Sequence, residues 1–105
     1  MSITNIDPYG LEGTVLVDKT QVKIVQQKVS PDFSVNKMVL AAGASFSFTT
    51  KSGTVMVIQG WGSVLNEEQK ISISPGMMYG LSRDDQITIE NTGVMECILI
   101  FFQAN

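Results

Sequence analysis

The chain contains no histidine, and its only cysteine is Cys97. Histidine is the commonest metal ligand in proteins and the commonest general base near neutral pH. Its absence excludes zinc held by histidines, non-haem iron of the two-histidine type, and every Ser-His or Cys-His nucleophile system. A lone cysteine also excludes an internal disulfide and gives no evidence for an oxidising compartment.

Charge is scarce as well. Charged residues make up 16% of the chain and the net charge is −3, whereas hydrophobic residues make up 44%. A disordered chain shows the reverse balance. No basic surface is available to release counterions from nucleic acid. We therefore expect a folded domain that binds no nucleic acid.

Long apolar runs and a targeting segment are also missing. The N-terminus has no basic region followed by an apolar core, so it does not resemble a secretory signal. The longest apolar run, residues 97–102, is far shorter than the roughly 20 residues that cross a bilayer. We expect a cytoplasmic protein that does not bind membranes.

The sequence does contain a succession of short β-rich runs separated by Gly, Pro, Asn and Asp. This pattern predicts an all-β domain with little or no helix, either a small antiparallel β-barrel or a jelly-roll sandwich. We expect strands over 14–17, 21–29, 35–41, 45–50, 54–59, 63–65, 70–74, 86–90 and 95–102. Residues 13–105 then form a single domain, and residues 1–12 form a loose N-terminal arm.

Two segments carry a pattern of glycines at characteristic separations. Residues 40–60 contain Gly43 and end in an apolar run that closes with Gly60. Residues 75–93 begin with Pro-Gly and end with Asn91-Thr-Gly. Together they resemble the two motifs of the cupin family of small β-barrels, with the family's own spacing from Gly76 to Asn91. The resemblance covers roughly residues 20 to 102 and implies a cupin-like barrel.

The positions of the family's metal ligands hold other residues here. By the resemblance, two histidines fall on Ser47 and Thr49, the glutamate on Gly53 and the third histidine on Ile87. Hydroxyl groups are poor ligands for a divalent transition metal, and Gly and Ile side chains supply none. We therefore expect no metal site and no cofactor. The family's dioxygenase and metal-dependent isomerase activities are not carried over.

The segment 45–51 alternates between two faces of a predicted strand. One face carries Ser45, Ser47, Thr49 and Lys51, and the other carries Phe46 and Phe48. If the hydroxyl face points into the barrel, it forms a neutral polar pocket for a small ligand, together with Gln59. If the phenylalanines fill the barrel, the hydroxyls face water. The alternation alone leaves both orientations open.

Further side chains extend the predicted ligand site. Arg83 could clamp an anion, and Asp84 could act as a base if burial raised its pKa. Trp61 and Tyr79 could stack on a ring. Charges in a turn are usually solvated, however, and such aromatics often cap a core or an interface. The predicted ligand-binding residues are Ser47, Thr49, Lys51, Gln59, Trp61, Tyr79, Arg83 and Asp84, and no catalytic residue is predicted.

Three functions remain open. The first is a metal-free cupin-like domain that binds a small metabolite in or at the mouth of its barrel. The second is a small metal-independent enzyme resembling cupin-type nucleoside phosphorylases, although their Val-Pro-x-x-Ser segment is missing near residues 80–85. The third is a structural homo-oligomeric assembly protein. The apolar run 98–102 predicts a sheet-to-sheet homodimer, and Cys97 is expected to be buried and inert.

Overall fold

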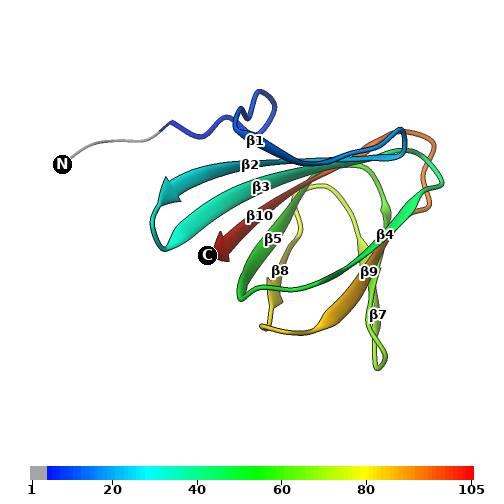
Figure 1. Cartoon of the computed structure of the whole chain (residues 1–105). Helices are drawn as coiled ribbons and strands as arrows, with labels where there is room; N and C mark the ends of the chain where they lie inside the picture. The colour runs from blue at the N-terminus through cyan, green and yellow to red at the C-terminus, as the bar shows by residue number, and fades with distance from the viewer. Residues whose placement is uncertain (1–4) are drawn as a thin grey trace.

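A computed structural model describes residues 5–105 as two antiparallel sheets that face each other (Figure 1). The strands are β1 (Thr14–Asp18), β2 (Val22–Ser30), β3 (Phe33–Leu40), β4 (Ser45–Thr49), β5 (Gly53–Gln59), β6 (Gly62–Leu65), β7 (Lys70–Ile73), β8 (Met78–Leu81), β9 (Gln86–Asn91) and β10 (Cys97–Ala104). The six-stranded sheet has the order β1-β2-β3-β10-β5-β8, and the four-stranded sheet has the order β4-β9-β6-β7.

This arrangement confirms the prediction of an all-β jelly-roll sandwich, and no helix occurs between residues 5 and 105. The two sheets do not close into a barrel. The large sheet ends at β1 and β8, and the small sheet ends at β4 and β7. Two seams therefore remain between the sheets, one between β1 and β4 and the other between β8 and β7. None of the described residues belongs to a helix that could cross a membrane.

The predicted strands are all present, with shifted ends, but β8 was not predicted. Its sequence is Met-Tyr-Gly-Leu, and glycine in a strand interior weakens the local signal. The strand forms because it pairs with β5, where Val55 lies opposite Tyr79. β3 begins at Phe33, earlier than predicted, because only Pro31 and Asp32 separate it from β2.

The structure explains two residues of the cupin-like motifs. Gly60 has a φ of 96°, and a Cβ atom at this position would lie 2.6 Å from Cys97 Sγ. Only glycine fits there without a shift of the neighbouring strand. Asn91 donates from Nδ2 to the carbonyls of Leu40 and Met95, each at 2.9 Å, and its Oδ1 accepts from Gly93 N at 3.0 Å. Asn91 thereby fastens the loop after β9 to the end of β3.

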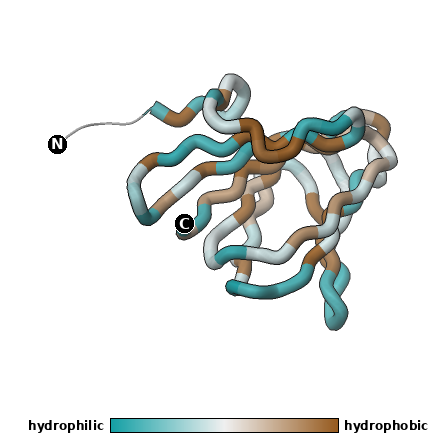
Figure 2. The backbone as a smooth tube through the Cα atoms, viewed as in Figure 1, coloured by the Kyte–Doolittle hydropathy of each residue, from teal (hydrophilic) through white to brown (hydrophobic). Residues whose placement is uncertain are grey.

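The main core lies between the two sheets. Its buried apolar side chains are Val22, Ile24, Met38, Leu40, Ala44, Val55, Val57, Val64, Ile73, Ile87, Ile89, Cys97, Leu99 and Phe101. Figure 2 shows hydrophilic residues at the tip of the β6–β7 hairpin and at the turn between β2 and β3, away from this core. Removing the core side chains from water is the principal force that holds the sheets together.

A smaller cluster lies on the outer face of the large sheet. Leu11, only 8% exposed, packs there with Val35 of β3 and Ile100 of β10. Lys37 Nζ also donates to the Tyr9 carbonyl at 2.8 Å. Part of the predicted arm, residues 1–12, therefore packs on the sheet, and residues 1–4 lie outside the described residues. The boundary between arm and domain stays a prediction.

Candidate functional site

Strand β4 turns its phenylalanines toward the interior. Phe46 and Phe48 are half-buried and pack against the core, and the rings of Phe48 and Phe101 meet edge to face at 5.5 Å. Ser47 and Thr49 lie on the outer surface of the small sheet. Ser47 Oγ lies 2.6 Å from Thr88 Oγ1, and Thr49 Oγ1 donates to Gln86 Oε1 at 2.8 Å. Of the two orientations left open by the sequence, the one with the phenylalanines inside is observed.

The inward-facing positions do not fit a metal ion. Phe46 and Phe48 occupy the inner face of β4, and Ile87, directly opposite Phe48, occupies the inner face of β9. None of these side chains has a donor atom. Between residues 5 and 105, no three Cys, Asp or Glu side chains lie close enough to share an ion. The described residues therefore offer no ligand set for the metal that the cupin resemblance implies.

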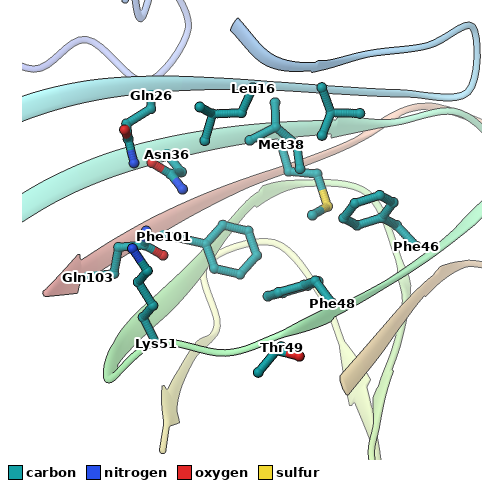
Figure 3. A pocket seen from close by; sticks show the side chains of 12 residues that line it. Leu16, Gln26, Asn36, Met38, Phe46, Phe48, Thr49, Lys51, Phe101 and Gln103 are labelled. Carbon is teal, nitrogen blue, oxygen red and sulfur yellow. The ribbon is translucent and has the colours of Figure 1, made fainter. Parts of the chain in front are cut away.

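A cavity of about 280 Å³ opens at the seam between β1 and β4, and we call it the Asn36 cavity (Figure 3). Its apolar lining consists of Leu16, Val17, Ile24, Met38, Phe46, Phe48 and Phe101. Its polar lining consists of Gln26, Asn36, Thr49, Lys51 and Gln103. Small-molecule sites are concave, mostly apolar and roughly 300–1,000 Å³ in volume. The lining of this cavity is mostly apolar and its volume lies just below that range, so it suits only a small ligand.

The polar part of this lining follows from strand register. On the inner face of the large sheet, Ile24, Met38 and Leu99 form an apolar row across β2, β3 and β10. The next row, one pleat along, consists of Gln26, Asn36 and Phe101. Opposing residues of antiparallel strands have Cβ atoms about 5 Å apart, so the two amides are neighbours. The inner face thus changes from apolar to polar along the strands.

Asn36 is the least expected residue in this row. Its side chain is only 9% exposed, and its Oδ1 atom is buried without a hydrogen-bond partner. A buried polar atom without a partner destabilises a protein by about 1–3 kcal/mol. Asparagine is also depleted from β-strands. Asn36 therefore weakens the folded state locally unless a group outside the chain satisfies it.

Among the described residues, Lys51 supplies the only cation that lines the Asn36 cavity. It lies in the turn between β4 and β5, and its side chain reaches toward Gln103 (Figure 3). The described residues that line the cavity include no Asp or Glu. The one ion pair found within residues 5–105 joins Lys70 to Glu90. The polar end of the cavity therefore has an uncompensated positive charge.

A second cavity, of about 230 Å³, lies at the seam between β7 and β8, and we call it the Tyr79 cavity. The side chains of Tyr79, Asn66 and Asp85 in its lining bond to the protein itself. Tyr79 Oη donates to the Ser72 carbonyl at 2.6 Å, and Asn66 Nδ2 donates to Asp85 Oδ2 at 3.2 Å. Asn66 Oδ1 accepts from the backbone N–H of Glu68 at 2.9 Å. These groups hold the loops together and need no ligand.

The other predicted site residues are dispersed. Gln59 Nε2 donates to the Glu96 carbonyl at 3.0 Å, and Trp61, 53% exposed, lies in the neighbouring loop. Arg83 is exposed in the turn before β9. Asp84 has a φ of 61° and borders an acidic hollow of about 360 Å³ with Glu67 and Glu68.

Of the eight predicted residues, Thr49 and Lys51 line the Asn36 cavity and Tyr79 lines the second one. The ligand-binding roles of all eight stay predictions. Gln26, Asn36 and Gln103 were not predicted as site residues. An asparagine between Val35 and Met38 in a predicted strand was the available signal, because that residue is unfavourable there.

Cys97 is buried, as predicted. Its Sγ donates weakly to the Trp61 carbonyl at 3.5 Å. Burial raises the pKa of the Cys97 thiol above its ordinary value, because desolvation disfavours the thiolate. This environment is the opposite of the one that activates a cysteine nucleophile.

Comparison with known proteins shows the fold. No family model matches the chain, and no curated protein matches it. Among solved structures, KdgF from Halomonas sp. has a TM-score of 0.71 at 15% identity, with 88% of each chain covered. The Cnp3 cupin domain of Schizosaccharomyces pombe has a TM-score of 0.70 at 18% identity, with 86% of this chain and 66% of that chain covered.

Ectoine synthase from P. lautus has a TM-score of 0.65 at 23% identity, with 81% of this chain covered. This chain spans 66% of the length of that synthase. At these identities the likeness establishes architecture and does not carry over an activity. The chain has the cupin fold.

Proposed function

We propose that this protein of cupin fold is a metal-free binding domain that takes one small molecule into the Asn36 cavity. The observation that carries the proposal is the buried Oδ1 of Asn36, which has no partner and lines that cavity. An O–H or N–H group of a ligand would supply the missing donor. The apolar walls would exclude water from this hydrogen bond and so strengthen it.

A comparison of Asn36 with a leucine at the same position supports this proposal. An apolar side chain of similar size would fill the row between Gln26 and Phe101 without burying an unpaired polar atom. Replacing an unsatisfied buried polar group by an apolar one is neutral or stabilising. Asn36 therefore has no stabilising role in the ligand-free fold, which favours a role in binding.

The lining favours binding over catalysis. It offers amides and one ammonium group, whereas the Thr49 hydroxyl is bonded to Gln86 on the outer surface, and it has no pair of a nucleophile and a base within hydrogen-bond reach. The predicted likeness to nucleoside phosphorylases involved Ser47–Thr50, and the Ser47 hydroxyl pairs with Thr88 on the outer surface. No observation favours the enzyme over the binding domain.

Methionine methyl groups test the proposal. Met38 lines the Asn36 cavity. Met95 is exposed in the loop between β9 and β10, at the end of β10 away from the cavity. Isotope-labelled methionine methyls are followed by NMR while phenethyl alcohol, a neutral probe with one hydroxyl, is added. We expect the Met38 signal to shift saturably and the Met95 signal to stay in place. An unchanged Met38 signal at millimolar probe would contradict the proposal.

A homodimer is a second, independent proposal. On the outer face of the large sheet, Met78 lies opposite Met56, and Met56 lies opposite Ile100. Met78 is exposed, Met56 is half-buried and Ile100 is buried, so the apolar pair Met78–Met56 across β8 and β5 lies partly open to solvent. We expect analytical ultracentrifugation to show a dimer that Met78→Lys dissociates. A monomer at every concentration would refute this proposal.

A further inference from the structure

Four of the five polar side chains of the Asn36 cavity gather at one end, namely those of Gln26, Asn36, Lys51 and Gln103. Gln26 lies directly opposite Asn36, and Gln103 lies one pleat further along β10. Gln103 also lies opposite Gly53, which follows Lys51 and Ser52 at the start of β5. Figure 3 shows these four side chains on one side of the cavity and Phe46, Phe48 and Met38 on the other. A ligand that satisfies both sides has a polar head and an apolar body.

The charge of the head follows from the lining. Lys51 contributes an ammonium group, and no described side chain that lines the cavity is a carboxylate. The acidic side chains of Glu67, Glu68 and Asp84 border a separate hollow. The four head-binding side chains therefore complement a single negative charge.

The head also requires a hydrogen-bond donor. Asn36 Oδ1 is an acceptor, and a carboxylate has only acceptor oxygens. A carboxylate alone would leave Asn36 Oδ1 unsatisfied or place two acceptors against each other. A hydroxyl next to the carboxylate supplies the donor. An ammonium group at that place would be repelled by Lys51, with no carboxylate of the described lining to balance it.

We infer that the ligand of the Asn36 cavity is an α-hydroxy carboxylate with an apolar side chain, an inference that rests on the function proposed above. The carboxylate lies at Lys51 and the glutamine amides, and the hydroxyl donates to Asn36 Oδ1. The apolar side chain packs against Phe48 and Phe101. No bond is made or broken.

Four matched compounds test this inference by titration of the Met38 signal. Phenyllactate carries both head groups, phenylpropanoate lacks the hydroxyl, phenyllactamide lacks the charge, and phenylalanine has an ammonium in place of the hydroxyl. We expect phenyllactate to bind best. Its affinity should exceed that of phenylpropanoate by about tenfold, which corresponds to one buried hydrogen bond. Its advantage over phenyllactamide should be about two- to fivefold, because Lys51 is exposed.

Two lysine variants isolate the charge. Lys51→Met keeps the apolar stem and removes the ammonium, and Lys23→Met is the matched control because Lys23 lies on the outer face of β2. We expect Lys51→Met to abolish the preference for phenyllactate over phenyllactamide. Lys23→Met should keep that preference. Asn36→Leu should instead lower the ratio of phenyllactate to phenylpropanoate affinity by about tenfold.

The outcomes separate this inference from the proposed function. If phenyllactamide or phenylalanine binds as tightly as phenyllactate, the assigned ligand class is wrong. A Met38 shift with phenethyl alcohol would then still support the cavity as a binding site. If neither phenethyl alcohol nor any of the four compounds shifts Met38, the inference and the proposed function both fail.

Discussion

Two buried asparagines in this sandwich differ in whether their side chains are hydrogen-bonded to the protein. Asn91, 2% exposed, makes three hydrogen bonds, which join it to the end of β3 and to Gly93 and Met95 of the loop between β9 and β10. Asn36, 9% exposed, has a buried Oδ1 with no partner. Each buries a polar amide in an apolar sheet, but only Asn91 recovers the lost hydration within the protein. The comparison separates a structural amide from one that is available to a ligand.

The two seams between the sheets also differ in whether their polar side chains have partners. The polar groups of Tyr79 and Asn66 at the β7–β8 seam bond to the protein. At the β1–β4 seam, Asn36 Oδ1 has no hydrogen-bond partner, and Lys51 has no acidic neighbour among the described lining residues. Cavities of similar volume therefore differ in whether these particular polar groups already have partners. We expect the substitutions below to separate the two regions.

The largest effect is expected for Asn91→Leu. The substitution removes three hydrogen bonds and leaves the carbonyls of Leu40 and Met95 without this donor. At about 0.5–1.5 kcal/mol for each bond, the free energy of unfolding should fall by roughly 2–4 kcal/mol. Urea denaturation followed by circular dichroism measures this. A change within experimental error would show that Asn91 is not the structural member of the pair.

Asn36→Leu should have the opposite sign. It replaces a buried unpaired amide by an apolar side chain, so the free energy of unfolding of the ligand-free protein should rise by about 1 kcal/mol or more. The same urea experiment measures it, with Asn91→Leu as the matched control. A loss of stability comparable to that of Asn91→Leu would make Asn36 structural and would remove the main support for the binding site.

Tyr79→Phe should have a smaller effect at the other seam. It removes the hydrogen bond from Tyr79 Oη to the Ser72 carbonyl, which is worth about 1 kcal/mol of folding free energy. Affinity for phenethyl alcohol should not change, because Tyr79 does not line the Asn36 cavity. A Tyr79→Phe protein that binds the probe tenfold more weakly would indicate that the two cavities are not independent.

Ser47→Ala should have the smallest effect. Ser47 and its partner Thr88 lie on the outer surface, where substitutions usually change stability by less than about 0.5 kcal/mol. Affinity for phenethyl alcohol, titrated through the Met38 signal, should stay within twofold of the parent. A large loss of affinity would return the ligand site to the hydroxyl face considered from the sequence.

Much of the fold could be predicted from local patterns. Alternation and turn residues located most strands, and Pro31 and Gly76 marked turns through their fixed or permissive φ. The orientation of β4 could not be predicted, because alternation shows which residues share a face but not which face meets the core. Pairing with Ile87 and Ile89 of β9 decides it, and that pairing is long-range.

The candidate site was harder to predict for the same reason. Lys51 was identified because it shares a short alternating segment with Ser47 and Thr49. Gln26 and Asn36 come from the consecutive strands β2 and β3 and Gln103 from β10 at the other end of the sequence, and strand register brings the three together. A single asparagine in a strand signals an unfavourable choice but does not show whether a partner satisfies it.

The most direct test of the account compares phenethyl alcohol with ethylbenzene, which lacks the hydroxyl, in the parent protein and in Asn36→Leu. Dissociation constants come from the Met38 signal in both proteins. If the hydroxyl donates to Asn36 Oδ1, the ratio of alcohol to hydrocarbon affinity falls by about tenfold in Asn36→Leu. An equal ratio in the two proteins would show that Asn36 does not contact the ligand and would contradict the account.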